Sequence, residues 1–253
     1  MTTTQLSPRL IATDDEVVAR LVGVGMRRGG KRVLEHVDLT VRRGRMLAVL
    51  GASGAGKSTI LDILAGELAP TEGRLDTGDA RLTRGVVHQA PLLFPWLTVV
   101  ENVRIGQTYA AHRDTRAELV DEMIQLLGLD GVRGHYPDQL SGGQAQRTSL
   151  ARALAVDHDL VLLDEPFSAL DPHARGQLQT WVRDQVHSHG WTGVIVTHDV
   201  DEALILADEI VVLGGAGRVT ASFEHSPCEP DTVRASPLRA PILAAYHAEA
   251  PDA

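Results

Sequence analysis

Apolar residues in this chain form short uninterrupted runs, separated by longer segments in which they recur at helical spacing. The uninterrupted runs are typical of strands buried on both faces, and they occupy residues 46–50, 86–88, 160–163, 193–197 and 209–213. Segments with the length and composition of helices occupy residues 58–68, 141–155, 174–189 and 200–207. This alternation predicts an α/β fold with a mainly parallel core sheet that helices cover on both faces.

The two ends of the chain differ from this pattern. Residues 17–24 and 37–41 are β-rich runs on either side of the basic turn RRGGKR (27–32), which predicts a small N-terminal antiparallel sheet. Residues 1–15 are polar, and we expect them to fray. From Ser226 onward the chain is rich in proline, which predicts that residues 226–253 are an irregular packing segment or partly disordered.

A helical insertion interrupts the alternation. Residues 90–103, APLLFPWLTVVENV, carry two prolines and cannot form one regular element. Apolar positions at helical spacing over 115–127 predict a helix, and Ser141 is suited to cap the next one. We therefore expect one domain over residues 16–225, with a helical subdomain at about 90–157.

Composition narrows the possible functions. A net charge of −9 argues against a nucleic-acid surface as the main function, because phosphate backbones attract basic proteins. The single cysteine, Cys228, excludes an internal disulfide and a cysteine-based metal cage. The N-terminal residues lack the apolar core of a secretory signal, and no apolar run is long enough to span a bilayer. We expect a soluble protein, or one that sits on a membrane only through partners.

The run GASGAGKST (51–59) fits the phosphate-loop motif G-x-x-x-x-G-K-[ST] and lies between a predicted strand and a predicted helix. Its glycines let backbone N–H groups curl around phosphate oxygens, and the helix N-terminus adds positive charge. Lys57, one of only two lysines in the chain, supplies a point charge, and the Ser58 hydroxyl suits Mg²⁺. A glycine turn that contains Lys-Ser by chance is the alternative. The predicted nucleotide-contacting residues are Gly51, Ala52, Ser53, Gly54, Ala55, Gly56, Lys57, Ser58 and Thr59.

Three other apolar runs end in residues that suit phosphate chemistry. Asp164 and Glu165 follow one run, His198 another and Gln89 a third. If these strands are neighbours, the side chains converge on the bound phosphates, because ligands bind at the carboxyl ends of parallel strands. Asp164 would hold Mg²⁺ with Ser58, Glu165 would orient and polarise a water, and His198 would donate to the γ-phosphate. Gln89 offers an amide oxygen either to Mg²⁺ or to the water, so Gln89 and Lys57 join Glu165 and His198 as predicted catalytic residues. The alternatives are that the acid pair caps a helix and that the histidine is structural.

The segment LSGGQAQR (140–147) lies between the phosphate loop and the run LLDEP (162–166), with SALD (168–171) beyond. In this order and spacing, over about residues 17–223, the chain resembles the ATPase subunit of ABC transporters. The resemblance implies a P-loop NTPase fold and a homodimer that encloses two ATPs. Ser141, Gly142, Gly143 and Gln144 of one copy would then contact the γ-phosphate on the phosphate loop of the other. A capped helix after a glycine turn is the alternative for this segment.

The resemblance also implies partners. In the family, the segment after the glutamine at position 89 grips a membrane-embedded permease, and the apolar residues 92–96 would suit such a groove. They could instead fill the insertion's own core. The segment FPWLTVVENV (94–103) is most similar to importers of the nitrate, sulfonate and taurine group, which work with an extracytoplasmic solute-binding protein. Polyamine, iron and thiamine importers carry related segments. The subunit would be cytoplasmic and peripheral on the inner face of the membrane.

One position departs from the family pattern. Where the family usually stacks adenine on an aromatic residue, this chain has Arg28. A guanidinium plane can also stack on a base, so Arg28 is predicted to contact adenine with weaker selectivity. Two other functions remain open: a soluble ATPase of the same superfamily that is not coupled to transport, and a nucleotide-binding scaffold without turnover.

Overall fold

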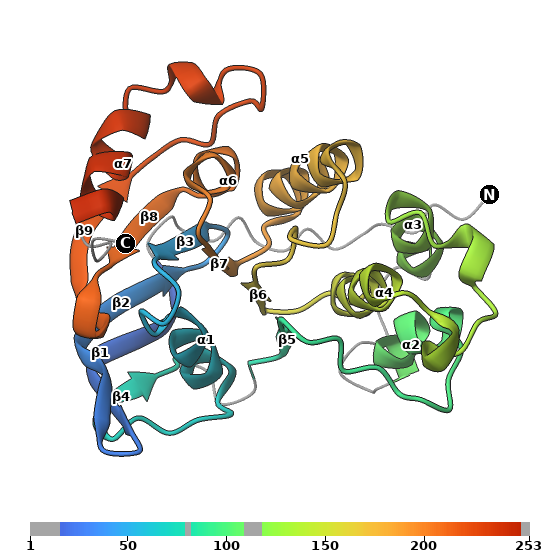
Figure 1. Ribbon diagram of the computed structural model, residues 1–253, viewed down its shortest axis with the longest axis horizontal. Helices are drawn as coiled ribbons and strands as arrows, with labels where there is room; N and C mark the ends of the chain where they lie inside the picture. Colours follow the sequence, from blue (N-terminus) through green and yellow to red (C-terminus); the bar gives the residue numbers. More distant parts are fainter. Residues whose placement is uncertain (1–15, 79–81, 109–117, 249–253) are drawn as a thin grey trace.

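A computed structural model describes residues 16–78, 82–108 and 118–248 (Figure 1). Its core is a six-stranded sheet in the order β5-β6-β7-β3-β8-β9, of which β9 alone is antiparallel to its neighbour. The strands are β3 (Met46–Gly51), β5 (Arg84–Val87), β6 (Leu160–Asp164), β7 (Gly193–Thr197), β8 (Glu209–Leu213) and β9 (Val219–Glu224). The mainly parallel core sheet predicted from the apolar runs is confirmed.

Both faces of the sheet are buried at β6, β7, β3 and β8, which explains why these strands are apolar without alternation, whereas the edge strand β9 alternates. In β3, Ala48 and Leu50 pack into one hydrophobic cluster with the helical side of the molecule. Leu47 and Val49 point the other way, into a cluster with α1 (Lys57–Ala65) and the N-terminal sheet. Successive side chains of one strand thus supply two separate cores.

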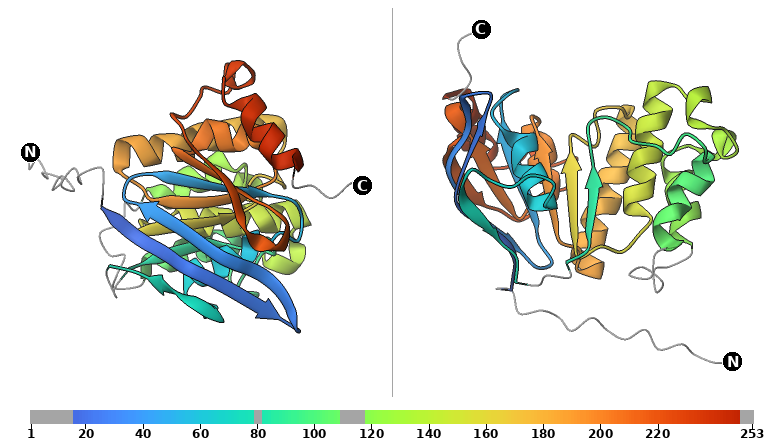
Figure 2. Two further views of the ribbon diagram at one scale, coloured as in Figure 1. Left: turned by 90° about the vertical axis from the view of Figure 1, so that its left-hand side faces the viewer. Right: turned by 90° about the horizontal axis from the view of Figure 1, so that it is seen from below.

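The second sheet is three-stranded and antiparallel, in the order β2-β1-β4 (Figure 2). β1 (Val17–Arg28) and β2 (Lys31–Arg42) form the predicted hairpin. β4 (Glu72–Asp76) has no counterpart among the strands predicted from the sequence. Four of the five residues of β4 are exposed, so the strand is held by backbone pairing to β1 and carries no apolar signal.

Short helices gather at the far end of the molecule from the N-terminal sheet, as Figures 1 and 2 both show. They are α2 (Val99–Arg104), α3 (Leu119–Leu126) and α4 (Gly142–Leu154), joined by 3-10 turns at Ile105–Thr108, Asp130–Val132 and Pro137–Gln139. The helix predicted over 115–127 is present as α3, and residues 115–117 lie outside the described chain. The helical insertion is confirmed.

The remaining helices are α5 (Pro172–His189), α6 (Val200–Leu206) and α7 (Arg239–Ala248), with 3-10 turns at Gly215–Gly217 and Val233–Ala235. α7 contradicts the expectation that the proline-rich tail is irregular. Pro241 is its third residue, where the missing N–H has no intrahelical partner to lose. Val233 and Ile242 are buried, so the tail is part of the core.

Asn102 of α2 fixes the segment that precedes its helix. Its side chain is fully buried, and its Oδ1 accepts the backbone N–H of Phe94 at 2.9 Å. Its Nδ2 lies 3.2 Å from the carbonyl oxygen of Phe94 and 2.9 Å from that of Leu97. The Asn102 amide therefore ties together the backbone of residues 94–98, which has no regular secondary structure.

Asn102→Ala should lower the free energy of unfolding by about 2–3 kcal/mol, because buried backbone groups lose their partners. Urea unfolding would measure the loss, and hydrogen exchange should rise selectively over residues 94–98. Thr108→Ala removes an exposed hydroxyl that bonds only its own 3-10 turn, and should change stability by less than about 0.5 kcal/mol. Equal effects of the two variants would contradict this role of Asn102.

Candidate nucleotide site

The phosphate loop runs from the end of β3 to the start of α1, and two of its glycines are required by close approach. A Cβ on Gly51 would lie 2.7 Å from the carbonyl oxygen of Leu213. A Cβ on Gly56 would lie 2.6 Å from Leu34 Cδ2, and Gly56 has a left-handed φ of 100°. The loop therefore curves against β2 and β8 in a way that residues with side chains could not follow.

Lys57 points back into this loop. Its Nζ donates to the carbonyl oxygens of Gly51 at 2.7 Å and Ala52 at 3.0 Å, and the side chain is buried. Burial lowers the pKa of Lys57, and the nearby charges of Glu165 and Asp164 act against that shift. A desolvated ammonium beside inward-turned backbone groups can attract a phosphate chain strongly.

The predicted magnesium ligands Ser58 and Asp164 lie together. Burial is the main cause that raises the pKa of Asp164, followed in the same direction by the charge of Glu165, while a hydrogen bond from Ser58 lowers it. A hydroxyl bonded to a half-buried carboxylate is a set of hard oxygen donors that fits Mg²⁺. A cation there would favour the charged carboxylate that burial disfavours.

Glu165 is held in a conformation that few non-glycine residues adopt. Its φ is +45°, in the left-handed region, which costs about 1–2 kcal/mol. Hydrogen bonds fix it there, because its N–H donates to Val196 at 3.0 Å and its carbonyl oxygen accepts from the Ser168 hydroxyl at 3.0 Å. His198 Nδ1 lies 3.3 Å from Glu165 Oε1, so the two predicted catalytic side chains are in contact.

Gln89 lies two residues beyond the end of β5 and is exposed. Val87 of β5 pairs with Leu163 of β6, which places Gln89 near the level of Glu165 along the sheet. The register also pairs Asp164 with Val196 and Leu50 with Thr197, so the four strand ends meet at one edge. The neighbouring strands on which the predicted convergence depends are present, and convergence of the side chains on phosphates stays a prediction.

Arg28 ends β1, and its guanidinium lies 3.4 Å from Asp62 Oδ2 on α1. The side chain is more than half exposed, so its flat face is open to a base. Ligand atoms of Asp62, Glu67 and His88 form a further group within 4.8 Å of one another, separate from the Ser58–Asp164 pair. Contact of Arg28 with adenine stays a prediction.

The signature segment forms the N-terminus of α4. The Ser141 hydroxyl accepts the N–H of Gln144 at 3.3 Å, and Gln144 Oε1 accepts the N–H of Ser141 at 2.9 Å. This reciprocal cap satisfies two backbone donors and leaves Ser141 and Gly142 exposed. In Figures 1 and 2, β5 and β6 lie between α1 and α4, so one chain does not bring the signature to its own phosphate loop.

The segment after Gln89 presents two apolar side chains to solvent. Leu92 and Trp96 are 58% and 68% exposed, so they do not fill the core of the helical subdomain. Phe94 is half-buried between Trp96, at 5.5 Å between ring centroids, and the guanidinium of Arg152, which lies 5.5 Å from its centroid. Residues 92–96 thus form a small apolar surface beside the site, which we call the docking segment.

Glu202 of α6 was not found from the sequence. It is 8% exposed, and its Oε2 accepts the Thr197 hydroxyl at 2.7 Å, while Thr197 Oγ1 accepts the N–H of Asp199 at 3.0 Å. Burial raises the pKa of Glu202. These bonds hold the turn that carries His198. The sequence feature that could have indicated Glu202 is an acidic residue within the largely apolar run VDEALIL (200–206).

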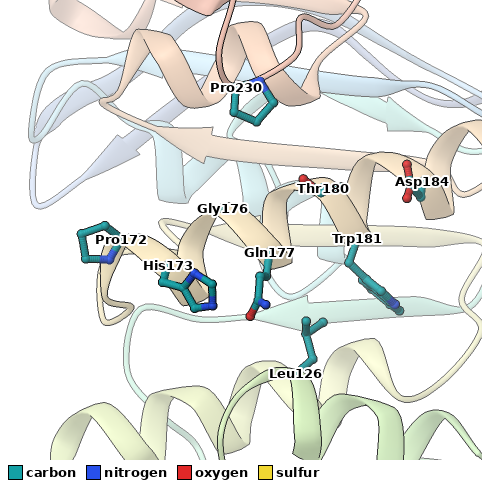
Figure 3. A pocket seen from close by; sticks show the side chains of 9 residues that line it. All are labelled: Leu126, Pro172, His173, Gly176, Gln177, Thr180, Trp181, Asp184 and Pro230. Carbon is teal, nitrogen blue, oxygen red and sulfur yellow. The ribbon is translucent and has the colours of Figure 1, made fainter.

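A groove of about 600 Å³ lies on α5, between the helical subdomain and the C-terminal tail (Figure 3). Gln177 and Trp181 point toward Leu126 of α3 across it. None of the residues predicted for the nucleotide site lines this groove. Among the described residues, no helix is both long enough and apolar enough to cross a membrane.

Comparison with known proteins agrees with this geometry. Residues 34–168 match the family model described as ABC transporter. The taurine import ATP-binding protein TauB of Escherichia coli O157:H7 is 42% identical over 198 residues, 76% of this chain and 78% of that protein. The sulfate/thiosulfate import ATP-binding protein CysA 2 of Agrobacterium fabrum is 41% identical over 208 residues, 78% of this chain and 61% of that protein.

Solved structures show the same fold. The ATP-binding cassette MJ0796, in a dimeric post-hydrolysis state bound to ADP and Pi, matches with a TM-score of 0.73 and 29% identity. The match covers 82% of this chain and 99% of that one. A family match over more than half of the chain, together with 42% identity to an import ATPase subunit, establishes the relationship. This chain belongs to the ABC transporter family, as a nucleotide-binding, ATP-hydrolysing subunit.

Proposed function

We propose that this subunit hydrolyses ATP between two copies of itself and that the cycle powers solute import through separate permease subunits. The observation that carries the proposal is the division of the site within one chain. The phosphate loop, Asp164, Glu165 and His198 lie at one sheet edge, whereas the signature lies beyond β5 and β6. A second copy, placed head to tail, supplies the missing signature.

Different residues of one chain have different roles in phosphoryl transfer. The phosphate loop and Lys57 hold the β- and γ-phosphates, and Glu165 orients a water and takes its proton. The water oxygen bonds to the γ-phosphorus as the bond to the bridging oxygen breaks, and His198 donates to the charged oxygens. Mg²⁺, with Ser58, Asp164 and Gln89 as ligands, neutralises charge on the phosphates when bound. The Glu165–His198 contact of 3.3 Å supports this pairing.

The partner copy closes the site. Ser141, Gly142, Gly143 and Gln144 of one copy contact the γ-phosphate held by the other, where the exposed N-terminus of α4 favours an anion. The dimer is isologous and buries two ATPs, so hydrolysis removes what holds it together. The dimeric cassette that matches this fold supports the arrangement.

Transport follows from the surface beside Gln89. The exposed Leu92 and Trp96 of the docking segment suit a permease on the cytoplasmic face of the membrane, with an extracytoplasmic solute-binding protein on the other side. Relatives named for taurine import and for sulfate/thiosulfate import support an importer of a sulfonate or a similar oxyanion.

Glu165→Gln should lower ATP hydrolysis by about 10²- to 10⁴-fold, because the amide cannot accept the water's proton. ATP binding should persist, and the dimer should become more stable. Phosphate release and ATP-dependent size-exclusion chromatography would measure both effects. The exposed Glu224→Gln serves as the control and should leave turnover and dimerisation unchanged. Full turnover by Glu165→Gln, or by strictly monomeric protein, would refute the proposed mechanism.

Arg28→Tyr should tighten ATP binding by roughly five- to tenfold and widen the preference for ATP over GTP, because an aromatic ring stacks on adenine better. The variant also breaks the exposed ion pair with Asp62, which is worth at most about 1 kcal/mol. Asp62→Asn breaks the same pair and keeps Arg28, so it should leave both affinities unchanged. Fluorescence titration would measure them, and equal values for wild type and Arg28→Tyr would count against base contact.

Trp96→Ser should abolish co-purification with the permease, because an exposed indole contributes much of the energy of a small interface. In the Glu165→Gln background the same variant should keep the ATP-dependent dimer, which separates docking from dimerisation. Pull-down of the co-expressed complex is the measurement. Retention of Trp96→Ser on the permease at wild-type level would exclude the docking segment as the contact.

A further inference from the structure

Gln146 joins two parts of the site that the proposed function assigns to different ATPs. It lies on α4, five residues after Ser141, and is only 6% exposed. Its Nε2 donates to the backbone carbonyl oxygen of His88 at 3.1 Å. His88 is the residue immediately before Gln89, so the signature helix of a chain is bonded directly to the strand end that carries Gln89 of the same chain.

His88 is also held from the opposite side. Its Nε2 lies 3.6 Å from Glu67 Oε1, just beyond the end of α1, the helix that begins at the phosphate loop. His88 therefore contacts α4 through its backbone carbonyl and the end of α1 through its side chain. A displacement of α4 relative to the core sheet therefore acts on the backbone next to Gln89.

The second amide atom of Gln146 gives this contact a direction. Its Oε1 is buried and has no hydrogen-bond partner among the described residues. A buried acceptor without a donor is unfavourable, so movement at this contact costs little hydrogen bonding on the oxygen side of the amide. In this structure the Gln146 amide therefore makes its bond to His88 through Nε2 and leaves its buried oxygen unpartnered.

We propose that Gln146 is a positioning residue that links signature engagement on one ATP to the placement of Gln89 on the other. α4 is a rigid helix, and Gln146 lies about 7.5 Å along its axis from the capping Ser141. When the signature end of α4 moves toward the partner's γ-phosphate, Gln146 carries the carbonyl of His88 with it. In a dimer, contact of the signature with one ATP then affects the position of Gln89 at the other ATP through Gln146 of the same copy. The inference rests on the proposed function, because it acts through the role of Gln89.

A double-mutant cycle on the full chain, at a concentration that supports dimerisation, tests this link. Gln146→Leu should lower kcat for ATP hydrolysis roughly tenfold in the otherwise unchanged chain, with KM for ATP within about twofold. In the Gln89→Ala background the same substitution should lower kcat by less than about twofold, since the group that Gln146 positions is gone. Gln146→Met, which keeps the unbranched shape, should repeat this pattern.

Thr148→Val is the matched control. Thr148 is buried on the same helix, but its hydroxyl bonds the carbonyl oxygen of Gln144 within α4 at 2.8 Å. Its effect on kcat should be the same factor in both backgrounds. If Gln146→Leu behaves as Thr148→Val does while Gln89→Ala alone lowers kcat, the proposed function stands and this link is overturned. If Gln89→Ala alone leaves kcat unchanged, the role of Gln89 is wrong and the link falls with it.

Discussion

The register of four parallel strands is the constraint on which this structure depends. Backbone hydrogen bonds align β5, β6, β7 and β3, so that their carboxyl ends reach one edge of the sheet together. A slip of one residue in any strand would turn its polar end group to the other face, because side chains alternate along a strand. The apolar cores on both faces prevent such a slip, since Leu47 and Ala48 each belong to a different core.

At the edge of this sheet, the predicted catalytic carboxylate lies on a residue with a strained backbone conformation. Glu165 has a positive φ, which the surrounding bonds to Val196 and Ser168 maintain. The strain is local and small against the stability of a domain, but it directs the carboxylate toward His198. The buried Glu202–Thr197 bond fixes the other half of the pair by holding the turn that carries His198.

Elements could be predicted from the sequence where local packing allows only certain residue types at a position. The phosphate loop could be predicted because Gly51 and Gly56 occupy positions that a Cβ would overfill, and the strand ends because each follows a run buried on both faces. The strand β4 and the tail helix α7 could not, because β4 is held by pairing with distant β1 and α7 by packing on α6, β8 and β9. The hydrogen-bond partners of Asn102 and Gln146 could not be predicted for a similar reason. Each side chain bonds the backbone of a segment that is neither helix nor strand.

The contact of Lys57 with its own loop has a consequence for how a nucleotide enters. The ammonium already sits among carbonyl oxygens of Gly51 and Ala52, out of bulk water. When a triphosphate binds, its oxygens therefore replace loop carbonyl oxygens around an ammonium that is already out of water. The desolvation and placement of the Lys57 ammonium are thus completed during folding, so this part of the cost of binding a phosphate chain does not arise when the nucleotide arrives.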